Sequence, residues 1–554
     1  MEKEVKSVEK FFNTAGPVRE ENNYIIDPLK RINKDEIMTL IDKWRYFILH
    51  APRQTGKTSS LLALQDYINK EGRYKCLYVN IETAQTARSD VARGMKAILA
   101  DLNGANSLVF NDDFFYLYLK EGIETFGEDA ILKEALSNWS TKNQKKIILL
   151  IDEIDALVGD TLISVLRQLR SGYAQRPESF PQSVILCGVR DVRDYRIFSD
   201  KDQQMITGGS AFNIKAKSLT VGDFTKEEIR TLYEEHTKET GQPFEEGVYD
   251  MAWEYTKGQP WLVNALANEA CFESEMGRDR TQPITTQMFE AAKNALIIRR
   301  DTHIDQLADK LKEERVRRVI EPLLSGKDMS NQFIYTDVEY VQDLGLIRVQ
   351  SNGAIEIANS IYHEVIPREL SIESQYGIIE ESQWYVNKDG KLNMMKLLKA
   401  FQQFFREHSE SWIERFQYKE AGPQLLIQAF LQRIINGGGL IDREYGLGKK
   451  RTDLYIRWPI IPERFKDSNT NYPFPIIYDN KTIQRIVIEL KLKHNNNLET
   501  VIEEGLKQTA KYVDKTGAEE AYLIIFDRDN ENWVERIFIE TRSYNNIEIT
   551  VFGM

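Results

Sequence analysis

The sequence predicts an α/β protein: a parallel sheet in its first part, then a helical lid and a winged helix, then a second α/β domain. Two observations predict the first sheet. Apolar runs of strand length alternate with helical patterns between residues 47 and 189, which is the order expected of a parallel α/β fold. The run at 147–151 is apolar throughout, as expected of a central strand covered on both faces.

A phosphate-binding loop is predicted at Ala51–Thr58, directly after the first apolar run. In such a loop, backbone N–H groups and the helix N-terminus bind phosphate oxygens, Lys57 reaches the β- and γ-phosphates, and Thr58 offers its hydroxyl to Mg²⁺. Ala51 stands where the motif G-x-x-x-x-G-K-[ST] usually has its first glycine, and alanine is the least intrusive replacement. The residues expected to hold the nucleotide are Pro52, Arg53, Gln54, Thr55, Gly56, Lys57 and Thr58.

Two carboxylates follow the apolar run at 147–151. Asp152, at the carboxyl end of a central strand, is expected to hold Mg²⁺ through water beside the phosphate loop. Glu153 is the candidate base that orients and partly deprotonates the attacking water. Helix capping by acidic residues would explain one carboxylate here but not the pair.

Two further features of this half have a chemical interpretation. The strand expected at 183–189 ends at Arg190 and Asp191, and either residue is a candidate to read the γ-phosphate; a solvated strand end is the alternative. Thr225 and Glu228 have the spacing of a capping box, which opens a helical region.

The five expected segments are 1–220 (ATPase core), 221–310 (helical lid), 311–370 (winged helix), 371–408 (linker) and 409–554 (second α/β domain).

The first half resembles the AAA-like P-loop ATPases of the STAND and archaeal-ATPase groups, over about residues 10–370. The resemblance rests on Ala51–Thr58, Ile147–Asp155, Cys187–Arg190 and Gly258-Gln259-Pro260. It implies binding and hydrolysis of ATP with Mg²⁺, contact of Pro260 with adenine, and a lid that switches with the nucleotide. No arginine finger is identified among the candidates Arg167, Arg170, Arg193, Arg299 and Arg300.

A second group of candidate catalytic residues lies near the C-terminus. The strand expected at Ile486–Leu492 places Glu489 and Lys491 on one face, with Leu490 facing the core. Asp453 is expected in the second strand of a hairpin that begins near residue 440. Asp453, Glu489 and the carbonyl of Leu490 would coordinate Mg²⁺, and Lys491 would position water or stabilise the developing charge.

A helix expected after this strand carries Gln508 and Tyr512 on one face, four residues apart. Asp, Glu-x-Lys and Gln-x-x-x-Tyr in this order resemble the PD-(D/E)xK nuclease superfamily, over about residues 409–530. The resemblance implies an additional acidic residue, best matched by Glu420, with Gln424 as the rival. Thr452 stands where that superfamily has proline. A strand with alternating surface charge is the plainer interpretation of Glu-x-Lys.

Composition limits the protein class. A hydrophobic content of 42% and a charged content of 29% are those of a folded, soluble protein. No apolar run is long enough for a membrane helix and no signal peptide is recognised, so we expect a cytoplasmic protein that does not bind membranes. The three cysteines lack metal-ligand spacing. A net charge of −12 argues against an overall basic surface, although Lys449, Lys450 and Arg451 could contact phosphate locally.

Three functions agree with these patterns. The first is an ATP-controlled, Mg²⁺-dependent nuclease that acts on nucleic acid, with DNA expected, in defence or in the handling of mobile elements. The second is a nucleotide-dependent switch that binds nucleic acid or a partner through an inactive nuclease fold. The third is a DNA-translocating motor, which the missing arginine finger disfavours. A homo-oligomer is compatible with all three, because a closed ATP site often needs a neighbour.

Overall fold

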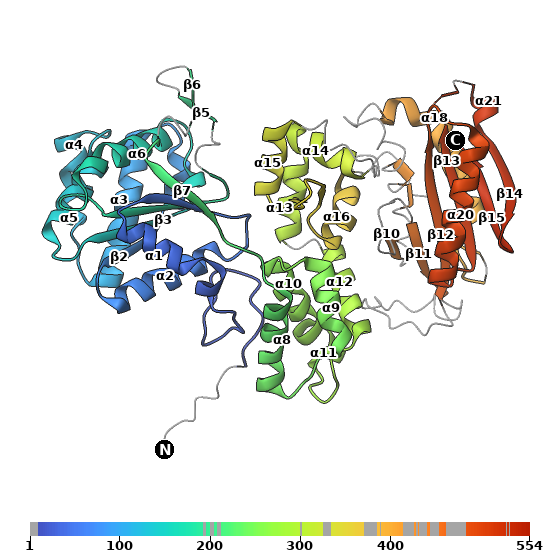
Figure 1. Ribbon diagram of the computed structural model, residues 1–554, viewed down its shortest axis with the longest axis horizontal. Helices are drawn as coiled ribbons and strands as arrows, with labels where there is room; N and C mark the ends of the chain where they lie inside the picture. The colour runs from blue at the N-terminus through green and yellow to red at the C-terminus, as the bar shows by residue number, and fades with distance from the viewer. Residues whose placement is uncertain are drawn as a thin grey trace. The chain divides into compact units, whose positions relative to one another are not determined.

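The computed structural model describes most of the chain in two compact units (Figure 1). The first unit comprises Met1–Ala292 with Asp343–Gly345, and the second comprises Lys293–Gln342 with Leu346–Met554. The described residues are 9–191, 196–199, 204–207, 212–299, 302–324, 334–370, 385–387, 389–413, 426–427, 430–431, 440–443, 454–460, 483–527, 529–530 and 532–554. The sequence predicts five segments, whereas the chain divides into two compact units.

A five-stranded parallel sheet organises the first unit, as predicted. Its strands are β1 (Tyr46–His50), β2 (Lys75–Asn80), β3 (Ile147–Asp152), β4 (Ser183–Gly188) and β7 (Lys215–Thr220). Their order is β2-β3-β4-β1-β7, and every neighbouring pair is parallel. We did not expect β7. It is a half-exposed edge strand with lysines among its residues, so it lacks the apolar run that identifies the four other strands.

Helices cover both faces of this sheet because alternate residues of its strands are buried on opposite sides. Phe47 and Leu49 of β1 belong to one apolar cluster, which also contains residues of two helices, α1 and α2. Tyr46 and Ile48 belong to the cluster that contains residues of three other helices, α3, α5 and α6. The helix bounds are α1 Lys34–Asp42, α2 Lys57–Glu71, α3 Val91–Phe110, α4 Ile123–Phe126, α5 Ile131–Lys142 and α6 Gly159–Gly172.

A group of helices follows β7, in the segment where the sequence predicts a lid. Its first helix begins with the predicted capping box: Thr225 accepts from the N–H of Glu228, and Glu228 accepts from the N–H of Thr225. Its helices are α8 Lys226–Thr240, α9 Glu246–Thr256, α10 Pro260–Asn268, α11 Glu275–Arg278 and α12 Thr286–Arg299.

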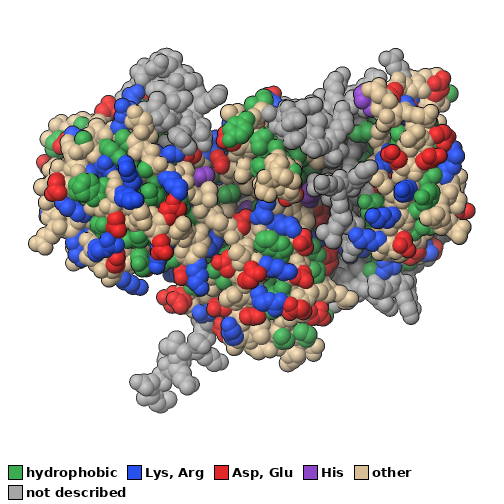
Figure 2. Space-filling model, in the orientation of Figure 1, with side chains coloured by type: hydrophobic (Ala, Val, Ile, Leu, Met, Phe, Trp, Pro, Cys, Tyr) green, Lys and Arg blue, Asp and Glu red, His purple; other side chains and the backbone are tan. Residues whose placement is uncertain are grey.

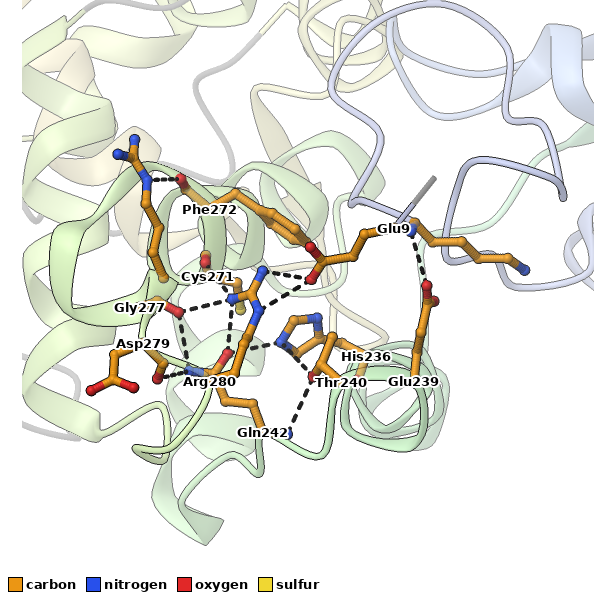
Figure 3. Close-up of polar contacts among 12 residues, drawn as sticks. Glu9, His236, Glu239, Thr240, Gln242, Cys271, Phe272, Gly277, Asp279 and Arg280 are labelled. Carbon is orange, nitrogen blue, oxygen red and sulfur yellow. Dashed lines mark hydrogen bonds and ion pairs between the residues drawn. The ribbon is translucent and has the colours of Figure 1, made fainter. Parts of the chain in front are cut away.

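A network of polar contacts joins the N-terminal segment to these helices (Figure 3). Arg280 donates to Glu9 over 2.8 Å and to the carbonyls of Cys271 and Gly277 over 2.7 and 2.8 Å. The buried ring of His236 lies 2.9 Å from Gln242 Oε1, and burial lowers the pKa of His236. The contact of Arg280 with Glu9, and that of the Tyr24 hydroxyl with His236 Nδ1 over 3.2 Å, join the N-terminal segment to these helices.

The second unit begins with helices and a short hairpin. Helix α15 and the antiparallel pair β8–β9 are the helix and hairpin expected of a winged helix. The element bounds are α13 Thr302–Leu311, α14 Glu314–Leu324, α15 Tyr335–Asp343, β8 Ile347–Val349, β9 Ile355–Ile357 and α16 Ser360–Leu370.

A six-stranded mixed sheet forms the C-terminal part of the second unit (Figure 1). Its order is β10-β11-β12-β13-β15-β14; β12, β13 and β15 run parallel to one another, and the predicted hairpin is β10–β11. One face of this sheet packs on α18 and the other on α20. The bounds are β10 Leu440–Arg443, β11 Leu454–Pro459, β12 Ile483–Lys493, β13 Glu520–Asp527, β14 Phe538–Tyr544, β15 Ile547–Gly553, α18 Met394–Ile413, α20 Leu498–Thr516 and α21 Trp533–Arg536.

The linker predicted over 371–408 is wrong for its second half. Helix α18 starts at Met394, and its buried Leu397, Phe401 and Phe405 belong to the same core cluster as Ile488 of β12. The spacing of these apolar residues is that of one helix face, so this stretch belongs to the second α/β fold.

Candidate functional site

The loop after β1, where the sequence predicts a phosphate-binding loop, contains two residues with a left-handed backbone. Gln54 and Gly56 have φ angles of 56° and 84°, a region that glycine adopts freely and other residues rarely. Lys57 opens α2 and is buried. Its Nζ donates to the carbonyls of Ala51 and Pro52 over 3.0 and 2.9 Å. The loop therefore holds the lysine against its own backbone, where a phosphate oxygen could replace these acceptors.

Asp152 lies at the end of β3, beside the start of α2. Its Oδ2 accepts hydrogen bonds from Thr58 over 2.7 Å and from the phenol of Tyr78, on β2, over 3.0 Å. Asp152 is fully buried, and burial raises the pKa of the Tyr78 phenol, so the phenol remains a donor. The structure thus brings together the predicted pair Thr58 and Asp152. It adds Tyr78, which the sequence reasoning missed because an aromatic residue on a strand signals only core packing.

Glu153 follows Asp152 with a left-handed backbone, φ 58°. Such a conformation costs about 1–3 kcal/mol for a residue other than glycine. Burial, Asp155 and Asp152 together raise the pKa of the Glu153 carboxyl. Asp155 accepts from the N–H of Val189, after β4, over 3.3 Å. Strained backbone and a perturbed carboxyl pKa are features that cluster at functional sites, and Glu153 has both.

Of the two candidates after β4, the structure shows what Asp191 does. Asp191 is buried, forms an ion pair with Lys215 of β7, and accepts from the hydroxyl of Ser218 over 2.7 Å. This carboxylate joins β7 to the end of β4, which is a structural role. Arg190 is half-buried beside it.

The Gly258-Gln259-Pro260 turn lies against the phosphate loop. Gln259 caps α10 by accepting from the N–H of Leu262 over 2.6 Å, and its Nε2 donates to the carbonyl of Gln54 over 3.4 Å. A cavity opens here between the N-terminal segment, the loop and the lid. Its lining includes Thr14, Tyr24, Arg31, Gln54, Pro260 and Trp261.

Trp261 and Arg31 are two cavity residues that the sequence reasoning did not select. Trp261 donates its indole N–H to the carbonyl of Thr14 over 2.8 Å, which joins α10 to the N-terminal segment. Arg31 donates to the carbonyl of Thr55 over 2.6 Å. Neither residue stands in a motif, and only the fold brings Arg31 beside a loop more than twenty positions away.

In the second unit, Glu489 and Lys491 lie side by side on β12, as the alternation predicts. Lys491 Nζ lies 2.8 Å from Glu489 Oε1 and also donates to Gln508 Oε1 on α20. Glu489 is buried, and its Oε2 has no hydrogen-bond partner among the described residues. Burial raises the pKa of Glu489, and Lys491 opposes this shift. Through these contacts of Lys491, the side chains of Glu489, Lys491 and Gln508 lie together.

The other predicted residues of this group have different outcomes. Leu490 faces the α18 core, as expected. Tyr512 is half-buried on α20, four positions after Gln508. Asp453, Glu420 and the basic residues 449–451 lie outside the described residues. Leu454, the next residue after Asp453, pairs with Ile488, the residue before Glu489. Within the described part of the chain, no cluster of three or more His, Cys, Asp or Glu side chains is arranged to hold a metal ion.

No protein-family model and no curated protein matches this chain. Among solved structures, a Walker-type ATPase of Pyrococcus abyssi is similar at 15% identity and a TM-score of 0.43, covering 64% of this chain and 99% of that one. The Aeropyrum pernix ORC1 protein, solved in complex with DNA, is similar at 16% identity and TM-score 0.32, covering 66% of this chain and 94% of that one.

A third similar structure is the Thermotoga maritima RuvB branch-migration motor, at 10% identity and TM-score 0.31, covering 60% of this chain and 95% of that one. Similarities with TM-scores below 0.5 assign no function to this chain. Separately, no helix among the described residues is long and apolar enough to cross a membrane.

Proposed function

We propose that this chain binds and hydrolyses ATP with Mg²⁺ and uses the nucleotide state to control a Mg²⁺-dependent nuclease site in its C-terminal fold. The observation that supports the first part is the hydrogen bond of Thr58 to Asp152 beside Lys57 and Glu153. A hydroxyl and a carboxylate that touch at a phosphate loop are the oxygen ligands that Mg²⁺ prefers. When bound, Mg²⁺ would neutralise charge on the phosphates.

The residues of this site divide the work of hydrolysis. Lys57 leaves the carbonyls of Ala51 and Pro52 and pairs with a phosphate oxygen. Glu153, whose carboxyl pKa is raised by burial and by Asp155 and Asp152, orients water and takes its proton. Pro260, which lines the cavity, packs against the adenine ring of the nucleotide. Arg190, which follows β4, is proposed to read the γ-phosphate.

The nuclease part is supported by the buried group on β12 and α20. Glu489 offers one buried oxygen, Oε2, that has no partner among the described residues. An unpartnered buried carboxylate oxygen is costly, and a cation is a natural partner for it. Glu489, the carbonyl of Leu490 and Asp453 would hold Mg²⁺, which would activate water and neutralise the scissile phosphate. Lys491, held by Gln508, would stabilise the developing charge.

Nucleic acid, with DNA expected, is the proposed substrate. On the face drawn in Figure 2, acidic and basic side chains of the described residues are interspersed. Binding would therefore depend on local phosphate contacts rather than on a wide basic surface. Glu420 and Tyr512 are proposed to support the nuclease site. A homo-oligomer is compatible with this function, and the proposed location of the protein is the cytoplasm.

The test compares cleavage of single- and double-stranded DNA and RNA with ATP, with a non-hydrolysable analogue and without nucleotide. Wild type is compared with Lys57→Ala and Glu489→Ala. We expect Glu489→Ala to abolish cleavage and leave ATP hydrolysis intact, and Lys57→Ala to remove the effect of nucleotide. If the wild type cleaves no substrate under any nucleotide condition, the nuclease part is wrong. Metal-independent nucleic-acid binding without cleavage would instead favour the binding switch.

A further inference from the structure

Arg31 is held rigidly beside the phosphate loop by a short turn. It ends the 3₁₀ turn Pro28–Arg31, which Asp27 caps by accepting from the N–H of Leu29 over 3.0 Å. Its guanidinium donates to the carbonyl of Thr55 over 2.6 Å and to the carbonyl of Gly222, where the chain leaves β7. The cation thus stands between the loop and the beginning of the lid.

The charge of Arg31 is poorly compensated in this position. Both of its hydrogen bonds end on neutral carbonyls, and its third contact is the ring of Phe224, 4.8 Å from the guanidinium carbon. Burial lowers the pKa of Arg31 to about 10, with Asp223 and Glu228 opposing the shift. The group stays charged at neutral pH, and a desolvated cation of this kind is stabilised by an anion placed beside it.

Two buried side-chain atoms have no hydrogen-bond partner among the described residues: Nε of Arg31 and Oε1 of Gln54. Both residues line the cavity, together with Gly56 and Pro260. A Cβ built on Gly56 would lie 2.7 Å from Arg31 Nη1, so the guanidinium lies directly against the loop. Buried polar groups of folded proteins are normally satisfied, so an unpartnered donor and an unpartnered acceptor on two residues of one cavity lining favour a polar ligand with both functions.

We propose that Arg31 and Gln54 contact the bound nucleotide through their side chains, Arg31 donating to a phosphate oxygen and Gln54 accepting from a ribose hydroxyl. Phosphate oxygens accept but do not donate at neutral pH, so they match the free Nε–H and not the free Oε1. A ribose hydroxyl supplies the donor that Oε1 needs. This inference rests on the proposed nucleotide site and adds the parts of the nucleotide that these residues read.

Calorimetric titration of the full chain with ADP and Mg²⁺ tests Arg31. We expect Arg31→Gln to weaken ADP binding about tenfold or more, and Arg31→Lys, which keeps the charge, to weaken it about threefold or less at low salt. Lys30→Ala is the matched control, because Lys30 is an exposed cation of the same turn. It should leave affinity unchanged. Equal losses in Arg31→Gln and Arg31→Lys would show a purely structural role and overturn the assignment.

Ribonucleotide analogues test Gln54. Wild type should bind either 2′-deoxy-ADP or 3′-deoxy-ADP more weakly than ADP, by about threefold to tenfold. Gln54→Asn, which tolerates the left-handed backbone but is shorter, should bind ADP and that deoxy analogue equally. If the variant still discriminates as the wild type does, Gln54 does not read the sugar. If the wild type binds none of these nucleotides, the proposed function fails and this inference fails with it.

Discussion

The hydroxyl of Thr58 donates to Oδ2 of Asp152 over 2.7 Å, although the two residues are 94 positions apart. This contact joins the phosphate loop after β1 to the carboxylate at the end of β3. We expect Thr58→Ala and Asp152→Asn each to slow ATP hydrolysis about a hundredfold or more. Thr58→Ala removes a hydroxyl ligand of the metal that balances phosphate charge, and Asp152→Asn removes the negative charge that holds this metal through water. Phosphate release across a Mg²⁺ titration measures this.

Thr39→Ala is the control for the first change. Thr39 is an exposed helix residue whose hydroxyl donates only to the carbonyl of Asp35, so this variant should hydrolyse ATP as the wild type does. Wild-type hydrolysis in both Thr58→Ala and Asp152→Asn would contradict the metal assignment.

Glu153→Gln should retain ATP binding and lose hydrolysis, because the amide cannot accept the proton of water. In the wild type, hydrolysis requires the charged carboxylate. The pKa of Glu153 is raised above its ordinary value of 4.5 by burial and by Asp155 and Asp152. The rate should therefore rise with pH through a pKa higher than that of an ordinary glutamate. The measurement is kcat against pH at saturating ATP; a rate in Glu153→Gln equal to that of wild type would exclude this residue as the base.

Gly258→Ala should strongly destabilise the lid. Gly258 has φ 85°, and a Cβ there would lie 2.0 Å from the carbonyl oxygen of Phe224. The left-handed backbone alone costs about 1–2 kcal/mol for alanine, and the clash adds about 1–3 kcal/mol. Gly241→Ala is the matched control: its φ is 78° and nothing lies within 4 Å. Hydrogen exchange of the α10 amides should accelerate much more in Gly258→Ala; equal rates in the two variants would contradict the close approach.

Glu489→Gln should change the pH dependence of stability in the C-terminal fold. Burial raises the pKa of Glu489 above 4.5, so between the unfolded and folded pKa values the folded state binds more protons than the unfolded state. Wild-type stability is therefore lost as pH rises through this window. The glutamine variant lacks this loss, and its melting temperature should gain on that of wild type as pH rises from about 4.5. A difference that stays constant with pH would contradict the raised pKa.

Much of the first site could be predicted because its chemistry is local in the chain. The order apolar strand, Gly56-Lys57-Thr58 and helix is contiguous, and so is the apolar run that ends in Asp152 and Glu153. Parallel strands bring their carboxyl ends to one edge of a sheet, so the approach of Thr58 to Asp152 follows from the motifs. The alternation of β12 predicts in the same way that Glu489 and Lys491 share a face.

The site residues and the strand that the sequence did not predict depend on contacts between distant segments of the chain. Tyr78, Arg31 and Trp261 stand in no motif, and they reach the site only because β2, the Pro28–Arg31 turn and α10 pack around the loop. Edge strand β7 lacks an apolar run because its side chains are only partly buried. The sequence by itself determined which residues can do chemistry. Only the tertiary structure decided which buried polar groups are satisfied, because burial and hydrogen bonding are properties of packing between segments rather than of any one segment.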